Sequence, residues 1–371
     1  MDGETVEEKR GRVVGYDLAR AFALFGMVVV NFKIVMGAED SGPEWLASLL
    51  GLLDGRAAAT FVVLAGVGVS LLSAGARESG DLAAQQGNRN LLLRRALFLF
   101  VVGLSYTPLW PADILHFYGI YIACAAFLLL TSTRRLMGIA VGLVVLFVVL
   151  LLTLNYELGW DWGTLSYEGM WTLHGMLRHL FFNGFHPVVP WLAFLLIGMV
   201  VGRLDLTVAA VRNRVLRWSI LGVLVGEGGS WALSRVVHGA GLMPQEEGDL
   251  LAILGTGPMP PAPFYMLAGS ATAVTVIVIC VAIGARYRDA GWMTPLVATG
   301  QLALTLYVAH VVLGMGVLEV AGALENQTLS FSLASAVVFC FASVLSAAAW
   351  RSRFRRGPLE WVMRMASGSR I

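Results

Sequence analysis

Long apolar runs separated by short polar segments make up most of the chain. A helix needs about 20 apolar residues to cross a bilayer, and three runs reach this length without any charged residue, at 137–156, 264–285 and 331–350. Seven further runs are interrupted only lightly, at 15–36, 57–74, 91–109, 112–130, 187–202, 218–237 and 295–320. The pattern predicts an all-α, polytopic membrane helix bundle of about ten transmembrane helices. Because the run at 187–202 is short and the stretch at 171–182 has the character of an interfacial or re-entrant element, nine and eleven helices remain alternatives.

Arginine and lysine side chains fall mainly on one side of the predicted membrane. If the N-terminus is cytoplasmic, 21 of the 26 basic residues lie on the cytoplasmic side, and acidic residues gather on the opposite side. Cytoplasmic loops of membrane proteins carry an excess of Lys and Arg, so we predict that both termini are cytoplasmic. The chain then divides into a cytoplasmic tail at 1–14, a transmembrane domain at 15–350 and a basic cytoplasmic tail at 351–371.

The composition supports this class of protein and excludes others. Hydrophobic residues make up 57% of the 371 residues and charged residues only 13%, whereas a soluble domain carries about 25% charge. Soluble enzymes, nucleic-acid-binding proteins, fibres and disordered chains are therefore excluded, and the net charge of +2 indicates no polyanionic partner. Cys124, Cys280 and Cys340 lie in apolar runs, so we expect neither a disulfide framework nor a metal site. The polar N-terminal stretch lacks the pattern of a removable signal peptide.

Ionisable groups inside a membrane span are costly and mark candidate functional sites. Asp17 and Arg20 share one helix face at the cytoplasmic end of the first span. They form either an intrahelical ion pair or a site where Arg20 faces an anionic ligand. Farther along the same span, Asn31 is either an interhelical hydrogen-bond donor or a donor to a developing oxyanion.

Three residues on the opposite side of the membrane form the candidate catalytic set. Asp113 and His116 lie three positions apart at the start of the run at 112–130, so the carboxylate can orient the imidazole for general-base chemistry. The alternative is a structural pair at the mouth of a helix. His186 precedes Pro187, which biases its backbone away from a helix, and irregular backbone at membrane depth survives where it is buried or lines a cavity. A purely structural role for His186 is the alternative.

Four further polar residues inside the predicted spans and two long loops are also candidate functional sites. Glu227 lies near mid-depth of the run at 218–237, where a carboxylate is protonated or paired. The run at 295–320 carries Gln301, Tyr307 and His310, of which His310 is either a satisfied core histidine or a proton-coupling group. The longest outside loops are 157–186, rich in tryptophan and histidine and including His174 and His179, and 238–263, rich in proline. Loops of this length are often functional.

Four segments together resemble the YeiB-type family of bacterial integral membrane proteins, a family classed as a domain of unknown function. They are RVVGYDLARAFALFG at 12–26 followed by Asn31, LRRAL at 93–97 with DIL at 113–115 and Tyr118, GQLALTLY at 300–307, and GPLEW at 357–361 with Arg364. The resemblance covers most of the chain.

A wider similarity extends to heparan-α-glucosaminide N-acetyltransferase and the transmembrane acyltransferase superfamily. It rests on the N-terminal segment and on PVVPW at 187–191, followed by Gly198 and Gly202. The similarity implies a transmembrane acyltransferase fold that moves an acetyl group from cytoplasmic acetyl-CoA to a sugar amine across the membrane. The chain departs from those relatives at 34–55, which contains no histidine where they carry one used in acyl transfer, and at Ala21 and Gln301, where the family signatures have Gly and Arg.

These observations favour an acyltransferase that uses acyl-CoA as co-substrate and no metal. The phosphates of acyl-CoA would bind near the cytoplasmic mouth, and His116 oriented by Asp113, or His186, would deprotonate the acceptor. The candidate cofactor-binding residues are Asp17, Arg20, Arg94, Arg95 and Asn31. The alternatives are a proton-coupled transporter or exporter of a small amphipathic solute, using Glu227 and His310, and a non-catalytic membrane scaffold.

We expect the protein to be a multi-pass component of the bacterial plasma membrane. Its expected partners are membrane lipid and a small-molecule or glycan acceptor, with no nucleic acid. A homo-oligomer is compatible with the sequence, which leaves open the acyl donor, the acceptor and the oligomeric state.

Overall fold

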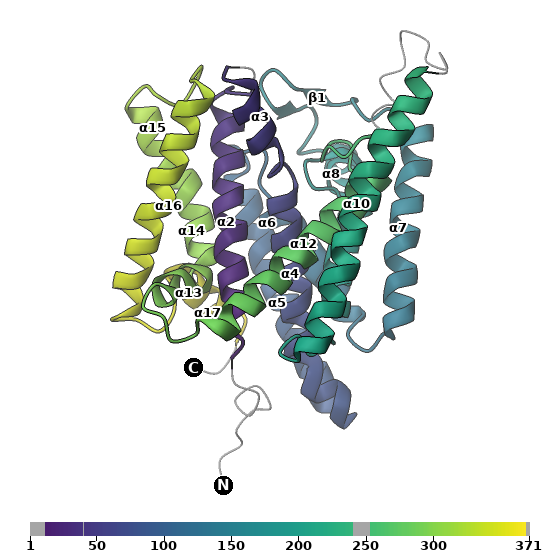
Figure 1. Cartoon of the computed structure of the whole chain (residues 1–371), viewed down its shortest axis with the longest axis vertical. Coiled ribbons are helices and arrows are strands. Elements are labelled where there is room, and N and C mark those ends of the chain that lie inside the picture. The colour runs from purple at the N-terminus through teal and green to yellow at the C-terminus, as the bar shows by residue number, and fades with distance from the viewer. Residues whose placement is uncertain (1–11, 40, 240–252, 369–371) are drawn as a thin grey trace. The chain divides into compact units, whose positions relative to one another are not determined.

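The computed structural model describes residues 12–39, 41–239 and 253–368, and Figure 1 labels its elements. Most of the predicted N-terminal tail, the central part of the loop at 238–263 and the last three residues of the predicted C-terminal tail lie outside the described residues. The chain forms two compact units, one comprising Met1–Phe61, Leu206–Arg212 and Val276–Ile371 and the other Val62–Asp205 and Asn213–Thr275.

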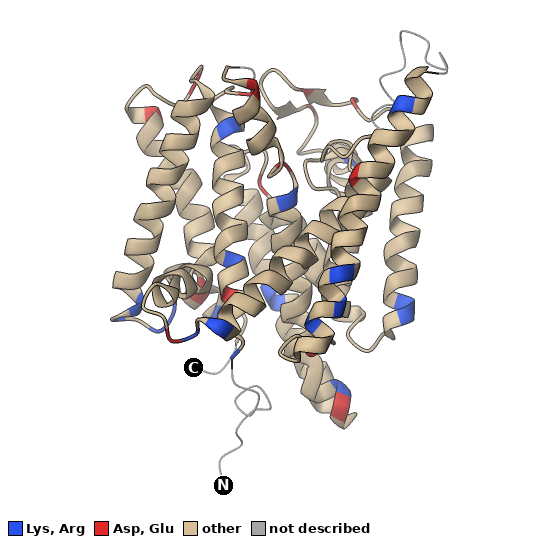
Figure 2. Ribbon diagram, viewed as in Figure 1, with Lys and Arg blue, Asp and Glu red and all other residues tan. Residues whose placement is uncertain are grey.

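Apolar helices make up the first unit. It contains α2 (Val14–Val35), α3 (Glu44–Gly51), the start of α4 (Arg56–Ser79), the end of α12 (Pro263–Arg286), α13 (Met293–Gln301), α14 (Ala303–Ala309), the π-helical turn η2 (His310–Met315), α15 (Gly316–Val320), α16 (Leu329–Arg351) and α17 (Pro358–Ala366). Helix α2 packs against α13, α14 and α16. In this unit basic residues gather at the start of α2 and at or beyond the ends of α12 and α16 (Figure 2).

The second unit is also helical, with a short two-stranded antiparallel sheet. It contains the rest of α4, α5 (Leu82–Tyr106), α6 (Leu115–Phe127), α7 (Thr133–Thr153), β1 (Trp160–Asp161), β2 (Ser166–Tyr167), α8 (Leu173–Arg178), the π-helical turn η1 (His179–Asn183), α9 (Val188–Val201), most of α10 (Ala209–Gly239) and the first part of α12. Helix α5 packs along α6, α7 along α9, and α6 against α9. Nearly every side chain of α9 is buried, which explains why its sequence is apolar on all sides.

Seven helices in the described part are long and apolar enough to cross a membrane, and the pair α8 and α9, bent by 50°, brings the number to eight if it counts as one span. The protein is therefore a multi-pass, all-α membrane protein. The two remaining predicted spans, 91–109 and 112–130, correspond to α5, whose first turns are polar, and to α6, which has only 13 residues. The count of ten and the side of the termini stay predictions.

The sequence pattern predicted one continuous helix for the apolar run at 295–320. The structure differs: the run breaks after Gln301 into α13 and α14. At the break a Cβ on Gly300 would lie 1.8 Å from the carbonyl oxygen of Asp17, so the two backbones touch there. The amide groups of Leu304 and Thr305, freed at the start of α14, donate to the carboxylate of Glu360 over 2.8 and 3.0 Å. Tertiary contacts thus stabilise a break that hydropathy does not reveal.

The predicted C-terminal tail at 351–371 contains the helix α17. Its first residue is Pro358. At this position a backbone N–H would have no partner within the helix, so a proline, which lacks that N–H, loses no hydrogen bond. Glu360 in its first turn reaches back to α14, which fixes α17 to the first unit.

Candidate active site

A buried carboxylate and imidazole form a hydrogen-bonded pair in the second unit. Oδ2 of Asp113 lies 2.9 Å from Nδ1 of His116 and 3.2 Å from the backbone nitrogen of the same residue. The other carboxylate oxygen accepts a hydrogen bond from the hydroxyl of Tyr106 over 2.5 Å. Both members of the pair are 0% exposed. The predicted spacing of Asp113 and His116 therefore does bring the two groups together.

The contacts of this pair fix the tautomer of its imidazole. An ionised carboxylate only accepts hydrogen bonds, so Nδ1 of His116 carries a proton, and when the ring is neutral Nε2 presents a lone pair. Nε2 is buried and has no hydrogen-bond partner among the described residues. Such an atom is suited to take a proton from a bound acceptor group.

Two more histidines lie in the same cluster of rings. The ring of His179 stacks on that of His116 with centroids 5.7 Å apart, and both His179 and His186 contact Phe117. The ring of His186 also packs against Trp191 at 4.6 Å. Within the described part, Nδ1 of His179, Nδ1 of His186 and Nε1 of Trp191 are buried without a hydrogen-bond partner. Unpartnered buried polar atoms are unusual, and these three belong to rings connected to His116 through contacts with Phe117, His179 and His186.

An aromatic loop between α7 and α8 packs against this cluster. Trp160 and Tyr167, which pair in the small sheet, both contact the ring of His179. Asn183 holds the loop: its side-chain amide donates to the carbonyls of Tyr156 and Leu158 over 2.7 and 2.9 Å. Its carbonyl accepts from the hydroxyl of Tyr167 over 2.8 Å. Burial raises the pKa of Tyr167, which keeps this hydroxyl protonated as a donor.

Local sequence explains how these groups are positioned. A Cβ on Gly103 would lie 2.3 Å from the backbone nitrogen of His116, so only glycine lets α5 approach the turn that carries the pair. Thr172 caps the N-terminus of α8. Pro187 is the capping residue just before α9, which leaves His186 in irregular backbone between η1 and α9, as its place before a proline predicted.

Sequence reasoning missed three members of this site. His179 was visible only as one of several histidines in the loop at 157–186, whereas His174 in the same loop is exposed. Tyr106 and Asn183 carried no sequence signal, because their roles depend on contacts with residues that lie elsewhere in the chain.

The other predicted residues of the second unit lie elsewhere. Arg94 and Arg95 lie on α5, eleven residues or more before its last residue, Tyr106. Glu227 on α10 accepts a hydrogen bond from Thr256 over 2.8 Å and is partly exposed. The carboxylate predicted to be costly therefore has a polar partner.

In the first unit, Asp17 and Arg20 form an ion pair, and Asn31 lies farther along the same helix. Asp17 accepts hydrogen bonds from Arg12 and Arg20, each over 2.7 Å, and from Gln301 over 3.4 Å. Asn31 lies on the same helix but eleven residues after Arg20, about 16 Å along the helix axis. Arg94 and Arg95 belong to the second unit, so the grouping of all five residues stays a prediction.

Asn31 instead contacts His310. Nδ2 of Asn31 lies 2.8 Å from Nε2 of His310, and Nδ1 of His310 donates to the carbonyl of Tyr307. His310 is 0% exposed, and both of its ring nitrogens are bonded. This arrangement is that of a satisfied core histidine, one of the two alternatives drawn from the sequence. No group of three or more His, Cys, Asp or Glu side chains suited to a metal ion occurs in the described residues.

Comparisons with known families give two matches that together cover most of the chain. A family model described as heparan-α-glucosaminide N-acetyltransferase, catalytic, matches residues 12–225, which is more than half of the chain. A second, described as protein of unknown function (DUF418), matches residues 261–369. No curated protein matches. The first match includes the Asp113–His116 pair and all three clustered histidines.

Proposed function

The chain belongs to the heparan-α-glucosaminide N-acetyltransferase catalytic family, and from this premise we propose that it is a transmembrane acyltransferase. It transfers an acyl group from acyl-CoA to a hydroxyl or amine of a sugar, lipid or envelope acceptor. The family match supports the class of reaction, and the donor and acceptor are part of our proposal.

The observation that carries the proposal is the state of His116. Its Nδ1 is bonded to Asp113, while its Nε2 is buried and has no partner in the described residues. A carboxylate that fixes the tautomer and stabilises the imidazolium makes the imidazole a stronger general base. His310, by contrast, has both nitrogens bonded.

The proposed step uses His116 first as a base and then as an acid. Nε2 takes the proton of the acceptor hydroxyl or amine as the acceptor oxygen or nitrogen attacks the thioester carbonyl. The carbon–sulfur bond then breaks, the acyl group stays on the acceptor, and the imidazolium returns the proton to the leaving CoA thiolate. The buried cluster around His116 excludes bulk water, which would otherwise compete as acceptor.

Arg94 and Arg95 are the residues of the second unit that fit the phosphates of acyl-CoA. Arginine binds phosphate oxygens in pairs. The two arginines precede Tyr106 by eleven to twelve residues on α5, about 16 to 18 Å along the axis. An extended pantetheine arm spans such a length, so phosphates at the arginines are compatible with a thioester near Asp113. We further propose that the arginine side faces the cytoplasm of a bacterial cell, as the distribution of basic residues predicts.

No observation favours the transporter alternative. It required Glu227 and His310 as proton-coupling groups, and each has hydrogen-bond partners of its own. A non-catalytic scaffold would not require a buried imidazole with an open nitrogen.

The test measures release of CoA thiol by the purified protein in nanodiscs, with acyl-CoA of several chain lengths and with amine and hydroxyl acceptors. We expect His116→Ala to lower turnover by about 10²- to 10⁴-fold. His174→Ala is the matched control, because His174 lies nearby in the sequence on α8 but is exposed. We expect it to leave turnover unchanged.

Thermal unfolding of both variants shows whether they fold. The proposal is wrong if a folded His116→Ala variant turns over like the wild type. It is also wrong if the wild type neither binds nor cleaves any acyl-CoA of the panel.

A further inference from the structure

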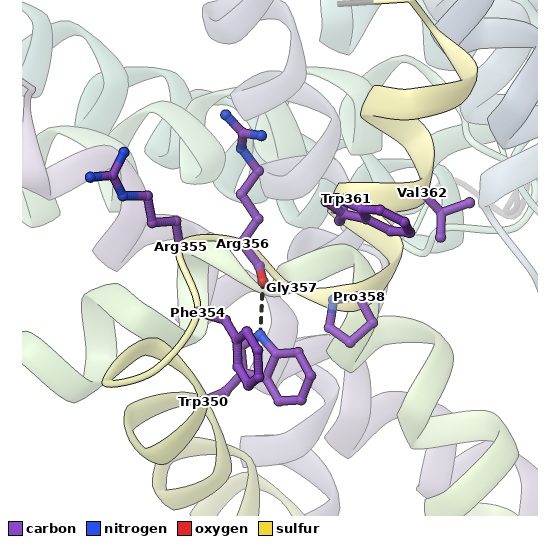
Figure 3. A pocket seen from close by; sticks show the side chains of 8 residues that line it. All are labelled: Trp350, Phe354, Arg355, Arg356, Gly357, Pro358, Trp361 and Val362. Carbon is purple, nitrogen blue, oxygen red and sulfur yellow. Dashed lines mark hydrogen bonds between the residues drawn. The ribbon is translucent and has the colours of Figure 1, made fainter. Parts of the chain in front are cut away.

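A pocket with a volume of about 460 Å³ lies where the chain passes from α16 to α17 in the first unit (Figure 3). Its walls are mostly aromatic and apolar, and two adjacent arginines flank them. The main lining side chains are Trp350, Phe354, Pro358, Trp361, Arg355 and Arg356.

The pocket is held by contacts within the same unit. Nε1 of Trp350 donates to the carbonyl of Arg356 over 2.7 Å, and the rings of Trp350 and Phe354 stack at 4.4 Å. A Cβ on Gly357 would lie 2.1 Å from Oε2 of Glu360, so a larger residue there would displace the Glu360 side chain. The walls are therefore built into the fold and do not depend on a ligand.

The outer face of α17 is apolar and exposed. Trp361 is 52% exposed, Met365 is 50% exposed, and Val362 is exposed as well. A helix with an exposed aromatic and aliphatic face next to basic residues is typical of a membrane interface. Since the chain is a multi-pass membrane protein, this face is suited to the boundary between headgroups and acyl chains.

The charge around the pocket is strongly positive. Five arginines lie between the end of α16 and the end of α17, at 351, 353, 355, 356 and 364. The nearby acid Glu360 is engaged with the amides of Leu304 and Thr305. The side chains of Arg355 and Arg356 form no ion pair with the described residues. Figure 3 shows both extending away from the rings of Trp350 and Phe354.

We propose that this pocket binds an anionic phospholipid of the bilayer. The lipid phosphate pairs with Arg355 and Arg356, and the glycerol and first part of an acyl chain lie against Trp350, Phe354 and Trp361. Arginine recognises phosphate, and the apolar walls require an apolar group joined to it. A free phosphate would use only the arginines, and it would leave the aromatic walls in contact with water. The inference rests on the membrane location and not on the acyltransferase activity.

The test titrates the purified protein in detergent with phosphatidylglycerol or phosphatidylcholine and counts bound lipid by native mass spectrometry. We expect Arg355→Gln/Arg356→Gln to weaken phosphatidylglycerol binding about 25-fold, since one arginine near an anionic lipid contributes about fivefold. Phosphatidylcholine, whose choline balances the phosphate charge, should bind the wild type more weakly than phosphatidylglycerol and should lose less affinity in this variant. The matched control is Arg134→Gln/Arg135→Gln, which removes two adjacent exposed arginines at the start of α7 and should retain phosphatidylglycerol binding.

A second variant tests the apolar wall. Trp361→Ala should weaken phosphatidylglycerol binding, while inorganic phosphate and CoA should compete poorly against the lipid in every protein. The proposal is overturned if both arginine pairs weaken binding equally, because the effect would then be general surface charge. It is also overturned if inorganic phosphate or CoA displaces the lipid from the wild type, or if Trp361→Ala and Arg355→Gln/Arg356→Gln both bind phosphatidylglycerol like the wild type.

Discussion

The imidazole of His116 donates from Nδ1 to Oδ2 of Asp113 over 2.9 Å, and neither side chain is exposed. The same carboxylate accepts from Tyr106, so both of its oxygens are bonded. His310 is equally buried, yet both of its nitrogens are bonded within the first unit. Two buried histidines in one chain thus differ in the property that matters for proton transfer, which is an open ring nitrogen.

The first prediction concerns Asp113. Asp113→Asn should lower kcat by about 10²- to 10⁴-fold, because an amide no longer fixes the imidazole tautomer or stabilises the imidazolium. The KM for acyl-CoA should stay near the wild-type value, since Asp113 has no role in our proposed phosphate site. Steady-state thiol release measures both constants. A higher KM for acyl-CoA together with an unchanged kcat would contradict the proposed role of Asp113.

A second prediction concerns the aromatic loop. Asn183→Ala removes two donated hydrogen bonds and one accepted bond, so we expect a loss of about 3 kcal/mol in local stability. Hydrogen exchange of the backbone amides at 156–167 should rise more than exchange in α7. Tyr167→Phe removes only the hydrogen bond that Asn183 accepts and should show a smaller increase. Unchanged exchange in the loop would mean that Asn183 does not hold it.

A third prediction concerns the junction of α14 and α17. The carboxylate of Glu360 accepts from the amides of Leu304 and Thr305 and from the hydroxyl of Thr305, the last over 2.5 Å. Glu360→Ala should lower stability by about 1 to 3 kcal/mol, because it leaves the start of α14 without acceptors. Thermal unfolding measures the change. Glu360→Gln keeps one acceptor oxygen and should recover part of the loss; equal unfolding temperatures for all three proteins would contradict the contact.

A fourth prediction concerns an ion pair in the first unit. Nζ of Lys33 lies 2.7 Å from Oδ2 of Asp54 and 3.4 Å from Oε1 of Glu39. The side chain of Lys33 is 8% exposed, and that of Asp54 is 28% exposed. Lys33→Met should therefore cost about 1 to 3 kcal/mol, less than the loss of a fully buried pair. The double variant Lys33→Met/Asp54→Asn should be more stable than Lys33→Met alone, and additive losses in thermal unfolding would argue against the pair.

Hydropathy alone predicted most helices close to their observed bounds. The run at 264–285 became α12 (Pro263–Arg286), and the run at 331–350 became α16 (Leu329–Arg351). Such runs are reliable because a helix in lipid satisfies its backbone groups internally, so the number and type of residues decide its existence. The prediction of one continuous helix at 295–320 was wrong, because the backbone of Gly300 contacts Asp17 and Glu360 binds the amide of Leu304. Local hydropathy encodes neither contact.

The sequence by itself determined that this is an apolar, all-helical membrane protein, and it placed Asp113 and His116 within reach of each other. Both conclusions depend on local spacing: the length of apolar runs, and the short separation of Asp113 and His116 at the start of α6. Only the tertiary structure decided that His116 keeps an open nitrogen while His310 does not, that His179 and Asn183 belong to the site, and that Asn31 lies with His310. These properties depend on contacts between segments far apart in the chain, and no local pattern records them.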